Sequence, residues 1–303
     1  MYDIIIVGAG PAGLTAAIYA RRAEKSVLVI EKDTFGGQIT HSPRVENYPG
    51  FIEMSGNELA DKLIEQAMAQ GAEIDIDEVI GVVGEPGNYT VVCNGGMHTA
   101  KSVIIATGSH HRNLGLEGEE KYIGEGVSYC AVCDGAFYRG KKVAVIGGGN
   151  SALQDAVLLS ESCEKVYVVQ NLPHLTGESR LQGILAGRDN VEIICSSVVK
   201  SIVEREGFAG IVIETDGESS VLDVDGMFVA IGQVPENEPF ADLAELNEYG
   251  YIISDETCAP RGASEGIFVA GDCRTKAIRQ VTTATADGAV AALAACRFID
   301  GLN

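Results

Sequence analysis

Two stretches of the chain carry the same order of apolar and polar positions. Residues 2–32 read YDIIIVGAGPAGLTAAIYARRAEKSVLVIEK: an apolar run, a glycine turn, an alanine-rich segment and a second apolar run. Residues 142–171 repeat this order as KVAVIGGGNSALQDAVLLSESCEKVYVVQN. The apolar runs are continuous rather than alternating, which is typical of parallel strands buried on both faces. Each stretch therefore predicts a strand–helix–strand unit with a glycine turn after its first strand.

The spacing of the glycines in both turns is that of dinucleotide-binding folds. The first glycine allows the tight turn, the second lets a pyrophosphate approach the backbone, and the third packs the helix against the strand. The phosphates then meet the positive end of the helix dipole. The sequence therefore predicts an α/β fold with two Rossmann-like nucleotide-binding domains, their turn positions being Gly8, Gly10 and Gly13 in the first copy and Gly147, Gly149 and Ala152 in the second.

Further strand-like runs indicate that the second unit is inserted into the first. One run ends in IIATGS at residues 104–109, and another ends in FVAIGQ at residues 228–233. GIFVAGDC at residues 266–273 then returns a strand close to the C-terminus, followed by a helical segment at residues 284–298. We therefore expect one domain built from residues 1–112 and 247–303, and an inserted domain of residues 113–246.

The residue at the end of each second strand indicates which nucleotide the unit binds. Glu31 lies 23 positions after Gly8, where a carboxylate accepts hydrogen bonds from an adenosine ribose. The same count from Gly147 leads to Gln170, and the first arginine beyond it is Arg180. The second unit thus lacks both the acid that favours NAD and the nearby arginines that bind the 2′-phosphate of NADP.

Charge and composition exclude several classes of protein. The chain has 22 Lys and Arg against 43 Asp and Glu, a net charge of −21, which argues against nucleic-acid binding. The apolar runs are short and broken by glycine, and no basic leader precedes a hydrophobic run, so we expect neither a membrane span nor a signal peptide. Eight cysteines, six of them isolated, do not form a secreted disulfide scaffold, and the expected location is cytoplasmic.

The segment GVSYCAVCDGAFYRG between the two units contains the only CxxC of the chain, Cys130 and Cys133. This spacing suits a redox-active dithiol, because a tight turn holds both sulfurs within bonding reach and lowers a thiolate pKa. Asp134 follows directly and is placed to act as a general acid or base. A zinc site would need a second Cys or His pair, which the isolated cysteines do not supply, so no metal is expected.

Together these motifs resemble the low-molecular-weight thioredoxin reductases over essentially the whole chain. The matching pieces are GAGPAG with Glu31, GGQ at 36–38, VENYPGF at 45–51, IIATGS, CAVCDG, GGGNSA at 147–152, GIFVAGDC and RQV at 279–281. The resemblance implies a flavin-dependent disulfide reductase and a homodimer, with FAD in the two-ended domain. It implies FAD contacts by Gly8, Gly10, Pro11, Ala12, Gly13, Glu31, Lys32, Gly37, Gln38, Asn47, Thr107, Gly108, Gly271, Asp272, Arg279, Gln280 and Val281.

The resemblance also implies how the parts work. Asp272 would bind the ribityl or phosphate part of FAD, and residues 279–281 would lie near the isoalloxazine. Cys133 would face the flavin, Cys130 would attack the disulfide of thioredoxin, and Asp134 would handle protons. In this family the smaller domain rotates, so we expect a hinge in the connections near residues 113–118 and 244–248.

The chain departs from the family at residues 170–175, where QNLPHL replaces the basic HRR-type segment of NADPH-dependent members. It is similar here to the ferredoxin-dependent flavin thioredoxin reductases, which lack the NADPH determinants. We therefore favour reduced ferredoxin as the electron donor over NADPH, with Leu172, Pro173 and Leu175 expected to close the ribose pocket. The net charge opposes this, since an acidic ferredoxin would be repelled unless a basic patch attracts it; the candidates are Arg44, Arg112 and the pair Arg274 and Lys276.

Three alternatives stay open. The first is an NADPH- or NADH-dependent thioredoxin reductase whose phosphate clamp comes from Arg180 or Lys200. The second is a flavin disulfide reductase that serves a peroxidase partner or a small disulfide. The third is a flavin-binding redox sensor, which is not an enzyme and uses the CxxC as a switch.

Overall fold

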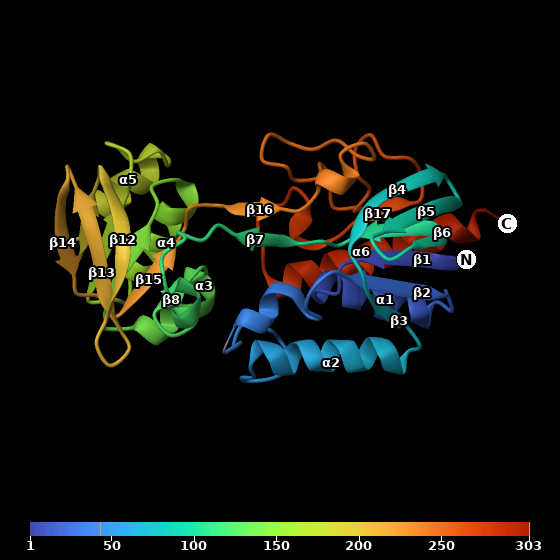
Figure 1. Cartoon of the computed structure of the whole chain (residues 1–303), viewed down its shortest axis with the longest axis horizontal. Helices are drawn as coiled ribbons and strands as arrows, with labels where there is room; N and C mark the ends of the chain where they lie inside the picture. Colours follow the sequence, from blue (N-terminus) through green and yellow to red (C-terminus); the bar gives the residue numbers. More distant parts are fainter. Residues whose placement is uncertain (43, 303) are drawn as a thin grey trace. The chain divides into compact units, whose positions relative to one another are not determined.

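The computed structural model of the protein describes residues 1–42 and 44–302 and divides into two compact units (Figure 1). Unit 1 is built from both ends of the chain, up to His110 and from Val234 onward, and unit 2 spans His111–Gln233. The chain passes between the units in β7 (Ser109–His111) and β16 (Gln233–Pro235), which pair with each other. The expected α/β architecture, with one nucleotide-binding unit inserted into the other, is confirmed.

The second boundary lies 13 residues before the expected position, at 233/234 rather than 246/247. The intervening residues pack into unit 1: Phe240 is 1% exposed within its core. The side-chain amide of Asn237, also 1% exposed, donates to the carbonyls of Gly250 and Cys273 at 2.9 and 2.7 Å. These contacts join residues distant in sequence, so the local pattern of residues 234–246 did not reveal them.

The sheet of unit 1 has the order β3-β2-β1-β6-β5-β4, with β17 beside β6. Strands β1, β2, β3, β6 and β17 run parallel, and β4, β5 and β6 form an antiparallel meander. Ile4 and Ile6 of β1 enter the core on one face of the sheet, and Ile5 and Val7 the core on the other. The strands are β1 (Tyr2–Val7), β2 (Val27–Glu31), β3 (Glu73–Ile76), β4 (Val79–Glu85), β5 (Asn88–Cys93), β6 (Met97–Ile105) and β17 (Ile267–Val269).

The described residues of unit 1 form three α-helices: α1 (Pro11–Arg22), α2 (Gly56–Ala69) and α6 (Val281–Asp300). Helix α2 begins with a capping box between Ser55 and Glu58. Helices α1 and α6 approach closely because Gly288 has no side chain: a Cβ there would lie 2.1 Å from the carbonyl oxygen of Ala12. Short 3-10 turns complete the unit: η1 (Gly37–His41), η4 (Glu238–Phe240) and η5 (Gly271–Cys273).

Unit 2 repeats the arrangement around the parallel sheet β11-β10-β9-β15-β8, and a three-stranded antiparallel sheet, β12-β13-β14, packs onto one of its faces. Val143 and Val145 of β9 face one core, and Ala144 and Ile146 the other. The elements are β8 (Val127–Ser128), β9 (Lys142–Ile146), β10 (Lys165–Val169), β11 (Val191–Ile194), β12 (Ser197–Glu204), β13 (Phe208–Thr215), β14 (Glu218–Leu222), β15 (Gly226–Val229), α3 (Ala131–Asp134), α4 (Asn150–Ser160), α5 (Ser179–Ala186), η2 (Glu119–Tyr122) and η3 (Gly135–Tyr138).

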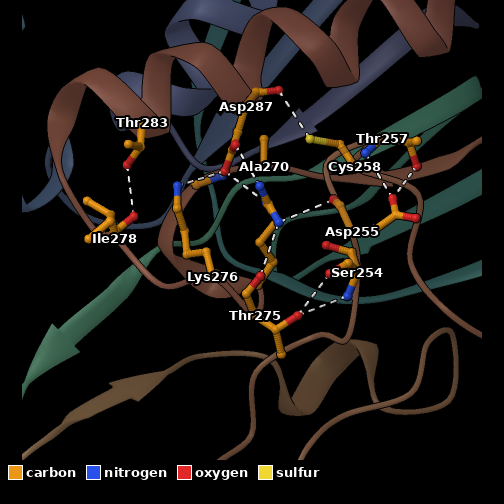
Figure 2. A network of polar contacts seen from close by, with 12 residues as sticks. Ser254, Asp255, Thr257, Cys258, Ala270, Thr275, Lys276, Ile278, Thr283 and Asp287 are labelled. Atoms are coloured by element: carbon orange, nitrogen blue, oxygen red, sulfur yellow. Dashed lines mark hydrogen bonds and ion pairs between the residues drawn. The ribbon is translucent and has the colours of Figure 1, made fainter. Parts of the chain in front are cut away.

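A buried charged network joins α6 to the segment after β17 (Figure 2). The carboxylate of Asp287 accepts hydrogen bonds from Nε and Nη2 of Arg274, at 2.9 and 2.8 Å, and from Nζ of Lys276 at 2.9 Å. It also accepts the backbone N–H of Gly271 at 3.1 Å. Burial alone would raise the pKa of Asp287, but its hydrogen bonds to Arg274 and Lys276 and their charges hold that pKa below its usual value. The ionised form is thus the one that the structure requires.

No helix in residues 1–42 and 44–302 is long and apolar enough to cross a lipid bilayer.

Replacing Asp287 with alanine leaves Arg274 and Lys276 buried without their carboxylate. We expect the free energy of unfolding to fall by about 3–5 kcal/mol, the usual effect of breaking a buried ion pair from one side. Urea denaturation of the purified protein measures this. Asp300→Asn on the same helix breaks an exposed ion pair with Lys25 and should leave the midpoint of urea denaturation almost unchanged. Equal effects of the two substitutions would contradict the central role of Asp287.

Candidate functional site

Cys130 and Cys133 form a disulfide at the start of α3, with their Cα atoms 5.2 Å apart. The backbone N–H of Cys133 donates to Sγ of Cys130 at 3.2 Å. In the reduced protein this donor stabilises a thiolate on Cys130, because hydrogen bonds to the charged form favour that form. Val132, between the two cysteines, is 60% exposed and presents an apolar surface beside the disulfide.

Ser128, in β8, connects the disulfide to Asp134. Its hydroxyl donates to Oδ2 of Asp134 at 2.6 Å and accepts the backbone N–H of Cys130 at 3.1 Å. Burial raises the pKa of Asp134, and the hydrogen bond from Ser128 offsets part of that rise. Asp134 therefore keeps its proton to a higher pH than an exposed aspartate, which suits a general acid. A serine two positions before a cysteine has no recognisable pattern, so sequence reasoning did not identify Ser128.

The first glycine turn has the close approaches that its spacing predicts. A Cβ at Gly8 would lie 2.3 Å from the carbonyl oxygen of Ala106, and one at Gly13 would lie 1.9 Å from that of Gly8. Gly10 differs, because a Cβ there would meet no atom within 4 Å among the described residues. Pro11 and Ala12 follow in the first turn of α1. The turn thus leaves open space at the positive end of this helix, where a pyrophosphate would bind.

Glu31 lies at the end of β2 beside this turn. Its carboxylate accepts the backbone N–H groups of Ala9 at 2.7 Å and Asp33 at 3.1 Å, and retains lone pairs for a ribose hydroxyl. Lys32 forms an ion pair with Glu236. These side chains line a pocket of about 360 Å³ in unit 1, whose other walls include Gly8, Asp77, Thr107, Pro235 and Phe240.

Two buried polar atoms near the start of α6 have no hydrogen-bond partner among the described residues: Oδ1 of Asp272 and Nε of Arg279. Burial raises the pKa of Asp272, while the charges of Lys276 and Arg279 act against that rise. The guanidinium of Arg279 lies 4.2 Å from the ring centre of Tyr251. Nζ of Lys276 lies 4.0 Å from Oδ1 of Asp272, too far for a hydrogen bond. Since buried polar groups normally have hydrogen-bond partners, this acceptor and the Nε donor of Arg279 are consistent with a polar ligand.

Among the remaining predicted FAD contacts, the segments of Gly37 and Gly271 reach the same turn. The N–H of Gly36 donates to the carbonyl of Ala9 at 2.9 Å, and a Cβ at Gly37 would lie 3.3 Å from Cα of Gly10. A Cβ at Gly271 would lie 2.9 Å from Cβ of Ala12. Elsewhere in unit 1, the amide of Asn47 donates to Oε1 of Gln280 at 3.2 Å, and Gln38, Gly108 and Val281 lie in or beside these segments. An open helix end, a carboxylate beside it and two buried polar atoms without hydrogen-bond partners among the described residues fit a flavin dinucleotide.

The second glycine turn, in unit 2, is covered differently. Gln170 is 5% exposed, and its side chain lies so close to Gly148 that a Cβ there would be 2.5 Å from Nε2. The backbone N–H groups of Thr176 and Gly177 donate to the carbonyl of Gly148 at 2.8 and 2.9 Å. Residues 170–178 contain no lysine or arginine. The loop thus folds back onto the turn without bringing a cation to it.

The expectation that apolar side chains close this turn is wrong for two of the three residues. Leu172 is 42% exposed and Pro173 is also exposed. Leu175 is partly buried and packs against the core of unit 2. The loop is held by its backbone, through Thr176, Gly177 and the bond from the Ser196 N–H to the Leu172 carbonyl at 2.9 Å. The side chains of Leu172 and Pro173 are therefore left facing solvent.

Known proteins of one family match this chain over nearly its whole length. The pyridine nucleotide-disulphide oxidoreductase family matches residues 2–288. A thioredoxin reductase of Bacillus subtilis is 43% identical, with 100% of this chain and 96% of the relative covered. A 34.2 kDa protein of the rubredoxin operon of Clostridium pasteurianum is 41% identical, with 99% and 97% covered. The crystal structure of a thioredoxin reductase from Streptococcus pyogenes has a TM-score of 0.94 at 38% identity, with 99% of each chain covered. The chain belongs to the thioredoxin reductase family.

Membership of the thioredoxin reductase family implies FAD, and the open turn, Glu31, Asp272 and Arg279 of unit 1 fit that cofactor. The individual contacts to FAD stay predictions. The described part of the chain brings together no set of three or more His, Cys, Asp or Glu side chains that would bind a metal ion.

Gly10→Ala tests the flavin cradle. The backbone at Gly10, with φ −74° and ψ −179°, accepts alanine, and the protein itself leaves room for the methyl group. The methyl group would occupy space that the pyrophosphate needs, so we expect FAD affinity to fall by at least about tenfold, roughly 1.4 kcal/mol. Flavin titration of the cofactor-free protein measures this, with Gly183→Ala in α5 as the control. Unchanged affinity would show that FAD does not approach Gly10.

Ser128→Ala tests the hydrogen bond from Ser128 to Asp134. Because the lost hydrogen bond lowers the pKa of Asp134, we expect that pKa to rise further in the variant. A ¹³C NMR titration of aspartate-labelled protein measures it, and Asp134→Asn identifies the signal. Ser160→Ala, which removes another buried hydroxyl of unit 2, should leave the titration unchanged. An Asp134 pKa that stays constant or falls in Ser128→Ala contradicts the assignment.

Proposed function

We propose that the protein is a thioredoxin reductase that passes electrons from reduced ferredoxin to the disulfide of a thioredoxin. The observation that carries the proposal is the disulfide between Cys130 and Cys133, with Asp134 held beside it by Ser128. The family supports the disulfide chemistry, and relatives named thioredoxin reductase support the substrate. Unit 1 would hold FAD, which supplies two-electron reduction to the disulfide when bound.

The reduced dithiol would act by thiol–disulfide exchange. The thiolate of Cys130 attacks one sulfur of the thioredoxin disulfide, which breaks that bond and forms a mixed disulfide. Asp134 gives its proton to the thiolate that leaves thioredoxin. The thiolate of Cys133 then attacks Sγ of Cys130, which restores the disulfide of the enzyme and releases the second thiolate of thioredoxin. Two electrons and the proton of Asp134 leave the enzyme, and the second thiolate of thioredoxin takes its proton from solvent. Exposed Val132 offers an apolar contact for the partner.

The second glycine turn supports ferredoxin over NADPH as the donor. An NADPH site needs cations for the 2′-phosphate, and residues 170–178 supply none. Asn150, the first residue of α4, exchanges hydrogen bonds with Glu178 at 3.3 and 2.7 Å, which brings an acidic side chain to the helix end where a pyrophosphate would bind. Each lost charge-assisted hydrogen bond would weaken NADPH binding by about 1.5–3 kcal/mol.

NADPH is the second candidate donor, and the intact turn of unit 2 favours it. Gly147 has a φ of +131° and lies against Ala230, and Ala152 at the third position is fully buried, as in a working nucleotide fold. The net charge of −21 also opposes long-range attraction of an acidic ferredoxin. Arg180 or Lys200 would then have to bind the phosphate. We further propose, from the family resemblance, a homodimer in the cytoplasm; light scattering of the purified protein tests the dimer.

Anaerobic mixing of the oxidised, FAD-loaded protein with NADPH, NADH or reduced ferredoxin decides between the donors. We expect rapid loss of flavin absorbance with ferredoxin alone, followed by the appearance of thiols on added oxidised thioredoxin. Rapid bleaching by NADPH would overturn the ferredoxin proposal and leave thioredoxin reduction standing.

Two single-cysteine variants test the disulfide end separately. Cys130→Ser and Cys133→Ser should both abolish thioredoxin reduction while the donor still bleaches the flavin. Thioredoxin reduction that survives in either variant would overturn the role of the dithiol. If bleaching occurs but wild-type protein never reduces thioredoxin, a different disulfide substrate or a redox-sensor role follows.

A further inference from the structure

Glu119 is a buried carboxylate, 2% exposed, that the exchange chemistry does not use. It accepts the backbone N–H groups of Leu114, Gly115 and Leu116 at 3.0, 2.8 and 3.1 Å. It also accepts the hydroxyl of Tyr129 at 2.9 Å. These four donors explain how the charge is tolerated in the interior. They also fix the chain just after it enters unit 2, so the hinge expected at residues 113–118 does not coincide with a loosely held segment.

Tyr129 connects Glu119 to the dithiol and to the two places where the chain passes between the units, here called the chain crossings. It directly precedes Cys130, and its ring stacks on that of His111 with the ring centres 5.1 Å apart and the planes inclined by 22°. Nδ1 of His111 lies 3.4 Å from the side-chain nitrogen of Gln233, the last residue before the chain returns to unit 1. Burial and the hydrogen bond to Glu119 raise the pKa of Tyr129, so its hydroxyl remains a donor at physiological pH.

We propose that Tyr129 is a positioning residue that holds the dithiol in a fixed place relative to the two chain crossings. Glu119, Tyr129, His111 and Gln233, here called the Tyr129 brace, make the dithiol and both ends of unit 2 one rigid body. Movement between the units is then confined to the crossings at 110–111 and 233–234, and every such movement carries Cys130 and Cys133 with it. The inference rests on the proposed function, in which electrons from unit 1 must reach the dithiol of unit 2.

Tyr129→Phe removes the hydroxyl bond to Glu119 and keeps the ring, whereas Tyr129→Leu removes both contacts. Tyr167→Phe, which changes a partly buried tyrosine of the same unit, is the matched control. The FAD-loaded protein is mixed anaerobically with dithionite and quenched with a maleimide, which counts the thiols formed at Cys130 and Cys133. Cofactor-free protein corrects for direct reduction, and dithiothreitol, which attacks the disulfide directly, measures its intrinsic reactivity.

In Tyr129→Phe we expect thiols to appear at least about tenfold more slowly with dithionite, the factor that one lost hydrogen bond to a charged group produces. The rate with dithiothreitol should stay within about twofold of wild type. Tyr129→Leu should slow the dithionite reaction further, and Tyr167→Phe should change neither rate. If Tyr129→Phe slowed thiol formation equally with dithionite and dithiothreitol, Tyr129 would be only a packing residue and the proposal would be overturned. Wild-type rates with both reductants would also overturn it.

Hydrogen exchange of the cofactor-free protein provides a readout that does not depend on electron transfer. Tyr129→Phe should speed exchange of the amides of residues 114–116, because Glu119 loses one of the donors that hold it in place. The control should leave this exchange unchanged. Unaltered exchange in Tyr129→Phe would overturn the brace. Neither measurement uses ferredoxin, NADPH or thioredoxin, so failure of the donor or substrate assignment stays distinguishable from failure of this inference.

Discussion

The carboxylate of Asp287 binds two cations and a backbone amide in the interior of unit 1, and the conformation of the segment between β17 and α6 depends on that charge balance. Arg274, Lys276 and Gly271 all belong to the segment between β17 and α6. The same segment carries Asp272 and Arg279, each of which has a buried polar atom without a hydrogen-bond partner among the described residues. A neutral side chain at position 287 would leave two buried cations uncompensated, so this helix position determines how the neighbouring loop presents its polar groups.

The two units share a backbone plan and differ in what stands at the end of the second strand. In unit 1, Glu31 supports the glycine turn through the N–H of Ala9 and still faces a pocket. In unit 2, Gln170 lies against Gly148, and the loop that follows bonds to the same glycine. The glycine turn of unit 1 is therefore open and lies beside a carboxylate. The glycine turn of unit 2 is covered by a loop that contains no lysine or arginine. The difference arises from single side chains and not from the fold.

Local patterns predict the features that depend on short-range geometry. The continuous apolar strands and the glycine spacing predict both units, since Gly8 and Gly13 meet backbone atoms that any such turn brings close. Contacts between distant segments leave no such pattern. Asn237 and Phe240 join unit 1 through residues far along the chain, which moved the boundary. Ser128 and Glu119 are likewise defined only by Asp134 and Tyr129, which folding brings to them.

The pairing of β7 with β16 also indicates how a chain with one domain inserted into another can evolve. The N–H of Arg112 donates to the carbonyl of Gly232 at 3.0 Å, so the second and the second-to-last residues of unit 2 lie one hydrogen bond apart. A segment with adjacent ends can enter a surface loop of another domain without separating the strands on either side. Unit 2 therefore has the adjacent chain ends that the insertion of a whole domain in a single genetic event requires. The same adjacency makes it suitable for circular permutation, with new termini in an exposed loop.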